Sequence, residues 1–177
     1  MAKLRPRNPG RMRAEWTATA GRCDRGAVMD DSHAEGPYEA GYALEDLAVG
    51  MTAAFEHVVT ERDVVQFADI SGDRNPVHLD ERYARTTRFK GRIVHGMLSA
   101  AFLSTTIASR LPGPGTIYLT QNLSFRAPVR IGDKVEAQVT VTDIIREKAR
   151  VVLKTVCRVG ETVVIDGDAL VMVPARG

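Results

Sequence analysis

The sequence predicts an α+β fold, a curved antiparallel sheet wrapped around one long helix. Three observations support this prediction. Residues 96–110 carry an apolar helical pattern rich in small side chains. After Gly115 the pattern changes to alternation of apolar and polar residues, which is typical of half-buried strands. Only short turns separate these strands, so they must pair antiparallel, since parallel pairs need crossovers of a dozen or more residues.

The first helix is predicted to begin after Thr60, whose side chain can accept a hydrogen bond from a free backbone N–H. Asp63 places a negative charge near the positive end of this helix. An apolar face follows over residues 64–68, and the pattern ends at Ser71-Gly72.

The long central helix is predicted from Gly96 to Arg110, and the Pro- and Gly-rich run 111–115 ends it. Before it, residues 76–90 are expected to be irregular, with one helical turn over 80–84. No charge interrupts the helical pattern before Arg110, so we expect the helix to be buried on all sides. The residues expected to share one face are Met97, Ala100, Ala101, Ser104, Ile107 and Ala108.

Four strands are expected after this helix, at residues 117–126, 135–141, 151–159 and 162–173. A tight connection at Gly160-Glu161 joins the last two.

The length of 177 residues, with 44% hydrophobic and 26% charged residues, suits one globular domain with its own core. The net charge of +2 is unevenly distributed. Residues 1–28 hold seven basic and two acidic residues, a balance of +5, and the remaining 17 basic and 20 acidic residues give −3. This excludes a strongly basic nucleic-acid-binding domain. The longest uncharged stretch, 93–109, contains His95, Gly96 and several hydroxyl groups, so no membrane span is expected.

Residues 1–41 are expected to be a disordered basic extension and linker, and the folded domain is expected at 42–175. Three interpretations of residues 1–28 stay open: a disordered extension or upstream start before Met29, an organelle transit peptide, and a nucleic-acid arm, which the shortage of aromatic residues disfavours. A secretory signal is excluded because the apolar segment it needs is missing. Cys23 and Cys157 are too few and too distant for a disulfide framework or zinc site, which indicates a reducing, cytoplasmic compartment.

The densest cluster of reactive groups follows the first helix. Asp73, Asn75 and His78 lie within six residues, on a loop punctuated by Gly72 and Pro76. Such a loop can direct the carboxylate and the imidazole at one point, while the amide holds the backbone or a substrate group. The alternative is a hydrogen-bonded turn in which the carboxylate and amide merely satisfy backbone groups.

A second cluster, His95-Gly96, stands at the start of the central helix. Gly96 allows close approach of a ligand to the backbone, and free N–H groups at a helix start favour developing negative charge. Alternatively, Gly96 only permits tight packing, and His95 caps the helix or belongs to the core. Together the clusters supply an acid/base pair and an oxyanion donor, as proton chemistry beside a carbonyl or thioester requires.

Other candidate sites are weaker, and no metal or cofactor is expected. A metal site at His78, Asp80 and His95 lacks a supporting ligand motif, and Gly113-Pro114-Gly115 lacks the glycine spacing of a dinucleotide-binding loop. Cys157 is expected to be a buried, inert thiol. The cations that could meet phosphates, but are expected to stay hydrated, are Arg88, Lys90, Arg126 and Arg130.

The segments Phe67–His78 and Ile93–Leu98 resemble the two motifs of the MaoC-like (R)-specific enoyl-CoA hydratases. Ser124–Val129 and Gly132-Asp133 resemble the strand and turn that follow the central helix in that family. The resemblance extends over residues 44–174. It implies the hot-dog fold, a long helix wrapped by a curved antiparallel sheet, which is usually dimeric.

By position, the resemblance implies that Asp73 and His78 form the catalytic pair and that Asn75 orients the loop. Gly96 would offer its N–H to the thioester oxygen, and Ser104 would line the acyl end of the site.

The implied reaction is reversible hydration of trans-2-enoyl-CoA to (R)-3-hydroxyacyl-CoA in fatty-acid metabolism, a hydro-lyase activity. Carrier-protein-bound substrates, as in a 3-hydroxyacyl dehydratase, stay open. A hot-dog thioesterase and a non-catalytic acyl-CoA-binding protein are the alternatives. The expected partners are the acyl thioester and a second copy of the chain, without nucleic acid or membrane.

Overall fold

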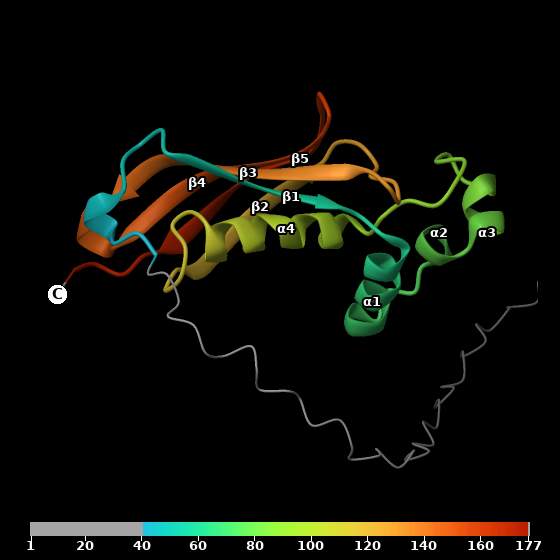
Figure 1. The fold of residues 1–177 in the computed structure, drawn as a ribbon, viewed down its shortest axis with the longest axis horizontal. Helices are drawn as coiled ribbons and strands as arrows, with labels where there is room; N and C mark the ends of the chain where they lie inside the picture. Colours follow the sequence, from blue (N-terminus) through green and yellow to red (C-terminus); the bar gives the residue numbers. More distant parts are fainter. Residues whose placement is uncertain (1–40, 177) are drawn as a thin grey trace, which may run out of the picture. The chain divides into compact units, whose positions relative to one another are not determined.

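The computed structural model describes residues 41–176 (Figure 1). Apart from Gly41, the predicted extension and linker lie outside the described residues, and so does Cys23. The expected domain boundaries therefore stay a prediction. In the described part of the chain, no helix is long and apolar enough to cross a membrane.

Five strands form one antiparallel sheet in the order β1-β3-β4-β5-β2, and the central helix α4 lies along one face of it (Figure 1). This arrangement confirms the predicted α+β class and the sheet wrapped on a helix. The strands are β1 (Thr52–Val58), β2 (Ile117–Phe125), β3 (Lys134–Ile145), β4 (Arg150–Val159) and β5 (Thr162–Met172). The helices are α1 (Glu61–Ser71), α2 (Pro76–Leu79), α3 (Glu81–Thr86) and α4 (Gly96–Ser109).

The hydrophobic core lies between α4 and the inner face of the sheet. Every second side chain of β3 from Val135 to Val141 is buried, as is every second one of β4 from Val151 to Cys157. Leu98, Phe102 and Leu103 face them from α4. Each large apolar side chain that is fully buried contributes roughly 1.5–3 kcal/mol. This packing fixes the N-terminal end of α4 relative to the sheet.

Helix α1 begins as predicted. Thr60 Oγ1 accepts a hydrogen bond from the N–H of Asp63 at 3.2 Å, and Asp63 Oδ2 accepts one from the N–H of Thr60 at 2.7 Å. The helix ends at Gly72, whose φ of 75° suits a residue without a Cβ. The chain therefore leaves α1 in a sharp turn directly before Asp73.

The expectation that α4 is buried on all sides is wrong for the single chain. Ala100 and Ile107 are buried, but Met97 is 58% exposed. A helix lying on a sheet buries only the face it turns to that sheet. No described element covers the opposite face, which also exposes Ala101, Ser104 and Ala108.

Two elements lie where the sequence patterns do not predict them. Strand β1 turns Ala53, Phe55 and His57 inward, an alternation too weakly apolar to recognise. Helix α2 lies inside the segment expected to be irregular. Its signal is the Asn75-Pro76 pair, an N-cap followed by proline in the first helical position.

Candidate active site

A cavity of about 400 Å³ lies at the N-terminal end of α4. Its wall combines the loop after α1, the start of α4, and the end of β2 with the residues that follow it. Asp73, His78 and Gly96 all line it. The structure therefore brings together the two clusters that the sequence analysis singled out. A concave, largely apolar space with a few converging polar groups is the usual form of a small-molecule site.

Asp73 is held in a short loop by its neighbours. Its N–H donates to Ser71 Oγ at 3.2 Å, and its Oδ1 accepts from the N–H of Asn75 at 3.1 Å. The Asn75 side chain accepts from the N–H of Val77 at 3.2 Å and so caps α2. Asn75 does not line the cavity, but it joins the Asp73 loop to the helix that carries His78. The Asp73 side chain remains exposed.

His78 is buried and fixed at three points. Its Nδ1–H donates to the carbonyl of Ile93 at 2.9 Å, and its backbone N–H donates to the carbonyl of Asn75 at 3.0 Å. Its own carbonyl accepts from Arg92 Nε at 2.6 Å. Because the Ile93 carbonyl can only accept, the proton of the neutral ring is on Nδ1 and the lone pair is on Nε2.

Burial lowers the pKa of the His78 imidazole below its ordinary value of 6.5. The hydrogen bond to Ile93 opposes this shift, His95 and Arg92 reinforce it, and the negative charge of Asp73 opposes it. The ring is therefore neutral at pH 7 and able to accept a proton on Nε2.

Gly96 is the first residue of α4, where backbone N–H groups have no acceptor within the helix. Among the described residues, no acceptor lies at the N–H of Gly96. A Cβ at this position would lie 2.7 Å from Cε1 of Phe125, so the ring packs where a side chain would otherwise be. A free N–H at the positive end of a helix can stabilise an oxyanion in the cavity.

The reactive atoms are close enough to share one small molecule. A carboxylate oxygen of Asp73 and one ring nitrogen each of His78 and His95 lie within 4.8 Å of one another. Two hydrogen bonds of about 2.8 Å to one water span this separation. Asp80, which the sequence analysis considered as a metal ligand together with His78 and His95, instead caps α3 by accepting hydrogen bonds from the N–H groups of Arg82 and Tyr83.

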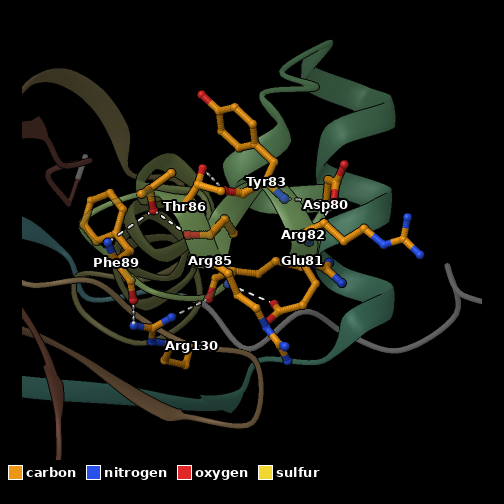
Figure 2. A network of polar contacts seen from close by, with 11 residues as sticks. Asp80, Glu81, Arg82, Tyr83, Arg85, Thr86, Phe89 and Arg130 are labelled. Carbon is orange, nitrogen blue, oxygen red and sulfur yellow. Dashed lines mark hydrogen bonds and ion pairs between the residues drawn. The ribbon is translucent and has the colours of Figure 1, made fainter.

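Two arginines that the sequence analysis did not connect with the site stabilise its backbone by donating hydrogen bonds to carbonyl groups. Arg92 holds the carbonyl of His78 and also pairs with Glu61 of α1 at 2.9 Å. Arg130 donates to the carbonyls of Arg92 and Phe89, at 2.9 and 2.5 Å, and Figure 2 shows its guanidinium reaching Phe89. Arg130 was expected to stay hydrated and instead binds backbone carbonyls. No local pattern identifies such contacts, because they join residues far apart in the sequence.

The remaining predicted residues divide between the cavity and the surface. Arg88 and Arg126 line the cavity, whereas Ser104 does not and is exposed on α4. Ser99, which the sequence analysis did not select, lines the cavity, and its hydroxyl has no hydrogen-bond partner in the described part of the chain. Cys157 is buried and, as expected, inert: burial raises its pKa to about 12.

Comparisons with known proteins agree with the fold. Residues 47–163 match the family model described as MaoC like domain. An (R)-specific enoyl-CoA hydratase from Rhodospirillum rubrum is 54% identical over 134 residues, covering 76% of this chain and 93% of that protein. A 3-hydroxybutyryl-CoA dehydratase from Methylorubrum extorquens is 51% identical over 133 residues, covering 75% and 85%.

A solved structure leads to the same family. The unliganded (R)-hydratase from Pseudomonas aeruginosa superimposes with a TM-score of 0.73 at 46% identity, covering 77% of this chain and 88% of that one. The family model matches well over half of the chain, and the two curated relatives exceed half identity along most of their length. The chain belongs to the MaoC-like dehydratase family and has its hot-dog fold.

Proposed function

We propose that this chain catalyses the reversible hydration of trans-2-enoyl-CoA to (R)-3-hydroxyacyl-CoA in fatty-acid metabolism. One observation carries the proposal: a carboxylate, a neutral imidazole and a free helix-start N–H line one cavity, from Asp73, His78 and Gly96. The relatives with 51–54% identity bear names of this reaction or its reverse, which supports the predicted hydro-lyase activity.

In the proposed mechanism, Asp73 and His78 hold one water between them. The water oxygen forms a bond to C3 of the enoyl group, and the electron pair of the double bond moves onto the thioester oxygen. One water proton passes through Asp73 and His78 to C2 on the same face, which restores the thioester carbonyl. Positioned acid/base groups of this kind contribute about 10²–10⁴-fold in rate.

Gly96 stabilises the transient negative charge on the thioester oxygen in this scheme. Its N–H donates to the thioester oxygen as the enolate forms, and the positive end of α4 adds to the stabilisation. One such donor is worth about 2.7–4 kcal/mol. Asn75 acts indirectly, because it couples the Asp73 loop to α2.

The proposed acyl carrier is coenzyme A. Arg88 and Arg126 line the same cavity, and Arg88 lies over the ring of Phe89 at 4.8 Å. Guanidinium groups suit the phosphates of this carrier. The relatives named as acyl-carrier-protein dehydratases are more distant, at 34–36% identity. The reaction needs only soluble substrates, and we place it in the cytoplasm.

The proposed assembly is a homodimer. Strand β2 is a nine-residue edge strand without charge or proline, the type of edge that pairs readily with another chain. Ile117 and Phe125 are exposed on it, and the small side chains of α4 form the other uncovered surface. A second copy related by a two-fold axis would cover both and would bring its own surface to Ser104. Light scattering of the purified chain should give twice the monomer mass. The substitution Leu119→Lys, which places a charge on β2, should lower the measured mass toward that of the monomer.

The function is tested with crotonyl-CoA. The purified chain should remove the enoyl absorbance, and chiral analysis should identify the product as (R)-3-hydroxybutyryl-CoA. Release of free thiol at the same rate, measured with a thiol-reactive dye, would indicate a thioesterase instead. Binding of crotonyl-CoA without turnover would indicate a non-catalytic acyl-CoA-binding protein.

A further inference from the structure

His95 is a buried ring in the site to which the proposed reaction assigns no task. It is 1% exposed and lies between two other rings. The Phe67 ring stands 5.0 Å from it, and the His78 ring stands 3.9 Å away at an interplanar angle of 30°. His95 is also the residue directly before Gly96, at the start of α4. It therefore contacts or adjoins all three groups of the proposed mechanism.

One hydrogen bond defines the state of this ring. His95 Nε2 lies 3.0 Å from the backbone carbonyl of Asp73. That carbonyl can only accept, so Nε2 carries a proton and donates it to this hydrogen bond. Nδ1 is buried and has no hydrogen-bond partner among residues 41–176. An apolar ring would fill this space without burying an unpaired polar nitrogen, so packing alone does not account for a histidine here.

The loop that carries Asp73 has few other supports. Its contacts with Ser71 and Asn75 are internal to the same short segment. Among the described residues, the bond from His95 is the one hydrogen bond that reaches the Asp73 backbone from another element. The distance between the Asp73 carboxylate and the start of α4 therefore depends on it.

We propose that His95 is a positioning residue that ties the Asp73 loop to the start of α4 and holds the catalytic carboxylate in register with His78 and Gly96. The inference rests on the proposed function. A misplacement of about 1 Å can cost on the order of 100-fold in rate. Loss of the Nε2–H bond should therefore lower kcat about 10–100-fold, while KM for crotonyl-CoA stays within about twofold.

Three substitutions separate this role from a merely structural one. His95→Phe keeps the ring packing and removes the donor. His95→Gln keeps a donor at the reach of Nε2, whereas His95→Asn carries the same amide one methylene shorter. We expect His95→Gln to recover most of the wild-type kcat and His95→Asn to lose as much as His95→Phe. Equal kcat values for the Gln and Asn variants would overturn the proposal, and this comparison holds even where His95→Phe does not fold.

A control and a coupling test complete the experiment. Val141→Ala removes buried methyl groups from β3 and should lower Tm without lowering kcat. In an Asp73→Asn background, His95→Phe should lower kcat by less than about threefold, because it acts through Asp73. Multiplicative losses in the double variant would contradict the proposal. A wild-type chain that does not hydrate crotonyl-CoA would overturn the proposed function itself, an outcome distinct from an active enzyme indifferent to His95.

Discussion

The substitution Asp73→Asn tests the proposed chemistry most directly. Asparagine has nearly the shape of aspartate, and its carbonyl oxygen can still accept the hydrogen bond from the N–H of Asn75 that Asp73 Oδ1 accepts at 3.1 Å. The backbone carbonyl of Asp73 also keeps its bond to His95. Because the side chain is exposed, the change leaves no buried group unpaired. The loop should therefore keep its conformation and lose only a group that accepts and returns a proton.

The expected loss follows from that single deficit. A positioned acid/base group contributes about 10²–10⁴-fold, which corresponds to about 2.7–5.4 kcal/mol in the activation free energy. We expect kcat for crotonyl-CoA hydration to fall by this factor and KM to change little, since the amide still fills the space of the carboxylate. The rate is measured as loss of enoyl absorbance, and Tm and circular dichroism verify the fold.

Asp69→Asn provides a matched control. Asp69 lies at the end of α1, is exposed, and pairs with Arg74 at 2.5 Å, so the substitution removes the same charge four residues away. An exposed ion pair is worth about 0–1 kcal/mol, and no loss of kcat is expected. If Asp73→Asn keeps kcat within about threefold of wild type, or Asp69→Asn loses as much, proton transfer by Asp73 is the wrong explanation.

Three further outcomes are expected. Because burial lowers the pKa of His78 below 6.5, kcat/KM should be level above pH 6.5 and fall only as the pH drops through the lowered pKa. The contribution of neutral His78 to the free energy of unfolding is likewise complete above pH 6.5 and is lost as the pH falls below it. A pH–rate profile with its acid limb above 6.5 would contradict this. Gly96→Ala should lower kcat/KM about tenfold, since its Cβ displaces Phe125, and added Phe125→Ala should restore part of it. Combined Arg88→Gln and Arg126→Gln should raise KM about tenfold for crotonyl-CoA and leave it unchanged for crotonyl-N-acetylcysteamine, which lacks phosphates.

The parts of the fold that the sequence predicted are those with local causes. The start of α1 depends on Thr60 and Asp63, three residues apart, and its end depends on Gly72. Strands β2 to β5 follow from alternation within each strand. Strand β1 was not predicted, because its inward positions are Ala53, Phe55 and His57, which alternate too weakly with polar residues. Its pairing with β3 joins residues far apart in the sequence, so no local pattern indicates it.

The contacts that hold the candidate site in place were not predicted, for a related reason. Arg92 reaches His78 across 14 residues and Arg130 reaches Phe89 across 41, so neither contact leaves a pattern within a sequence window. The sequence patterns alone did not decide whether His95 is a helix cap or a core residue. The structure places it in neither role alone: it precedes α4 and is buried, but it makes no cap hydrogen bond and instead holds Asp73.

The error about α4 is itself informative. Helical periodicity measures how apolar a face is, and it cannot tell whether the same chain or another one covers that face. In the single chain, Met97, Ala101 and Ser104 stay exposed, on a helix without charge from its first residue to its last. A soluble helix normally places charged groups on an uncovered face, because they are better hydrated than small apolar ones. The helix would be completely buried, as predicted, if a second copy of the chain packed against its exposed face. In that assembly Ser104 no longer faces solvent, and whether it lines the acyl end of a site becomes a property of two chains.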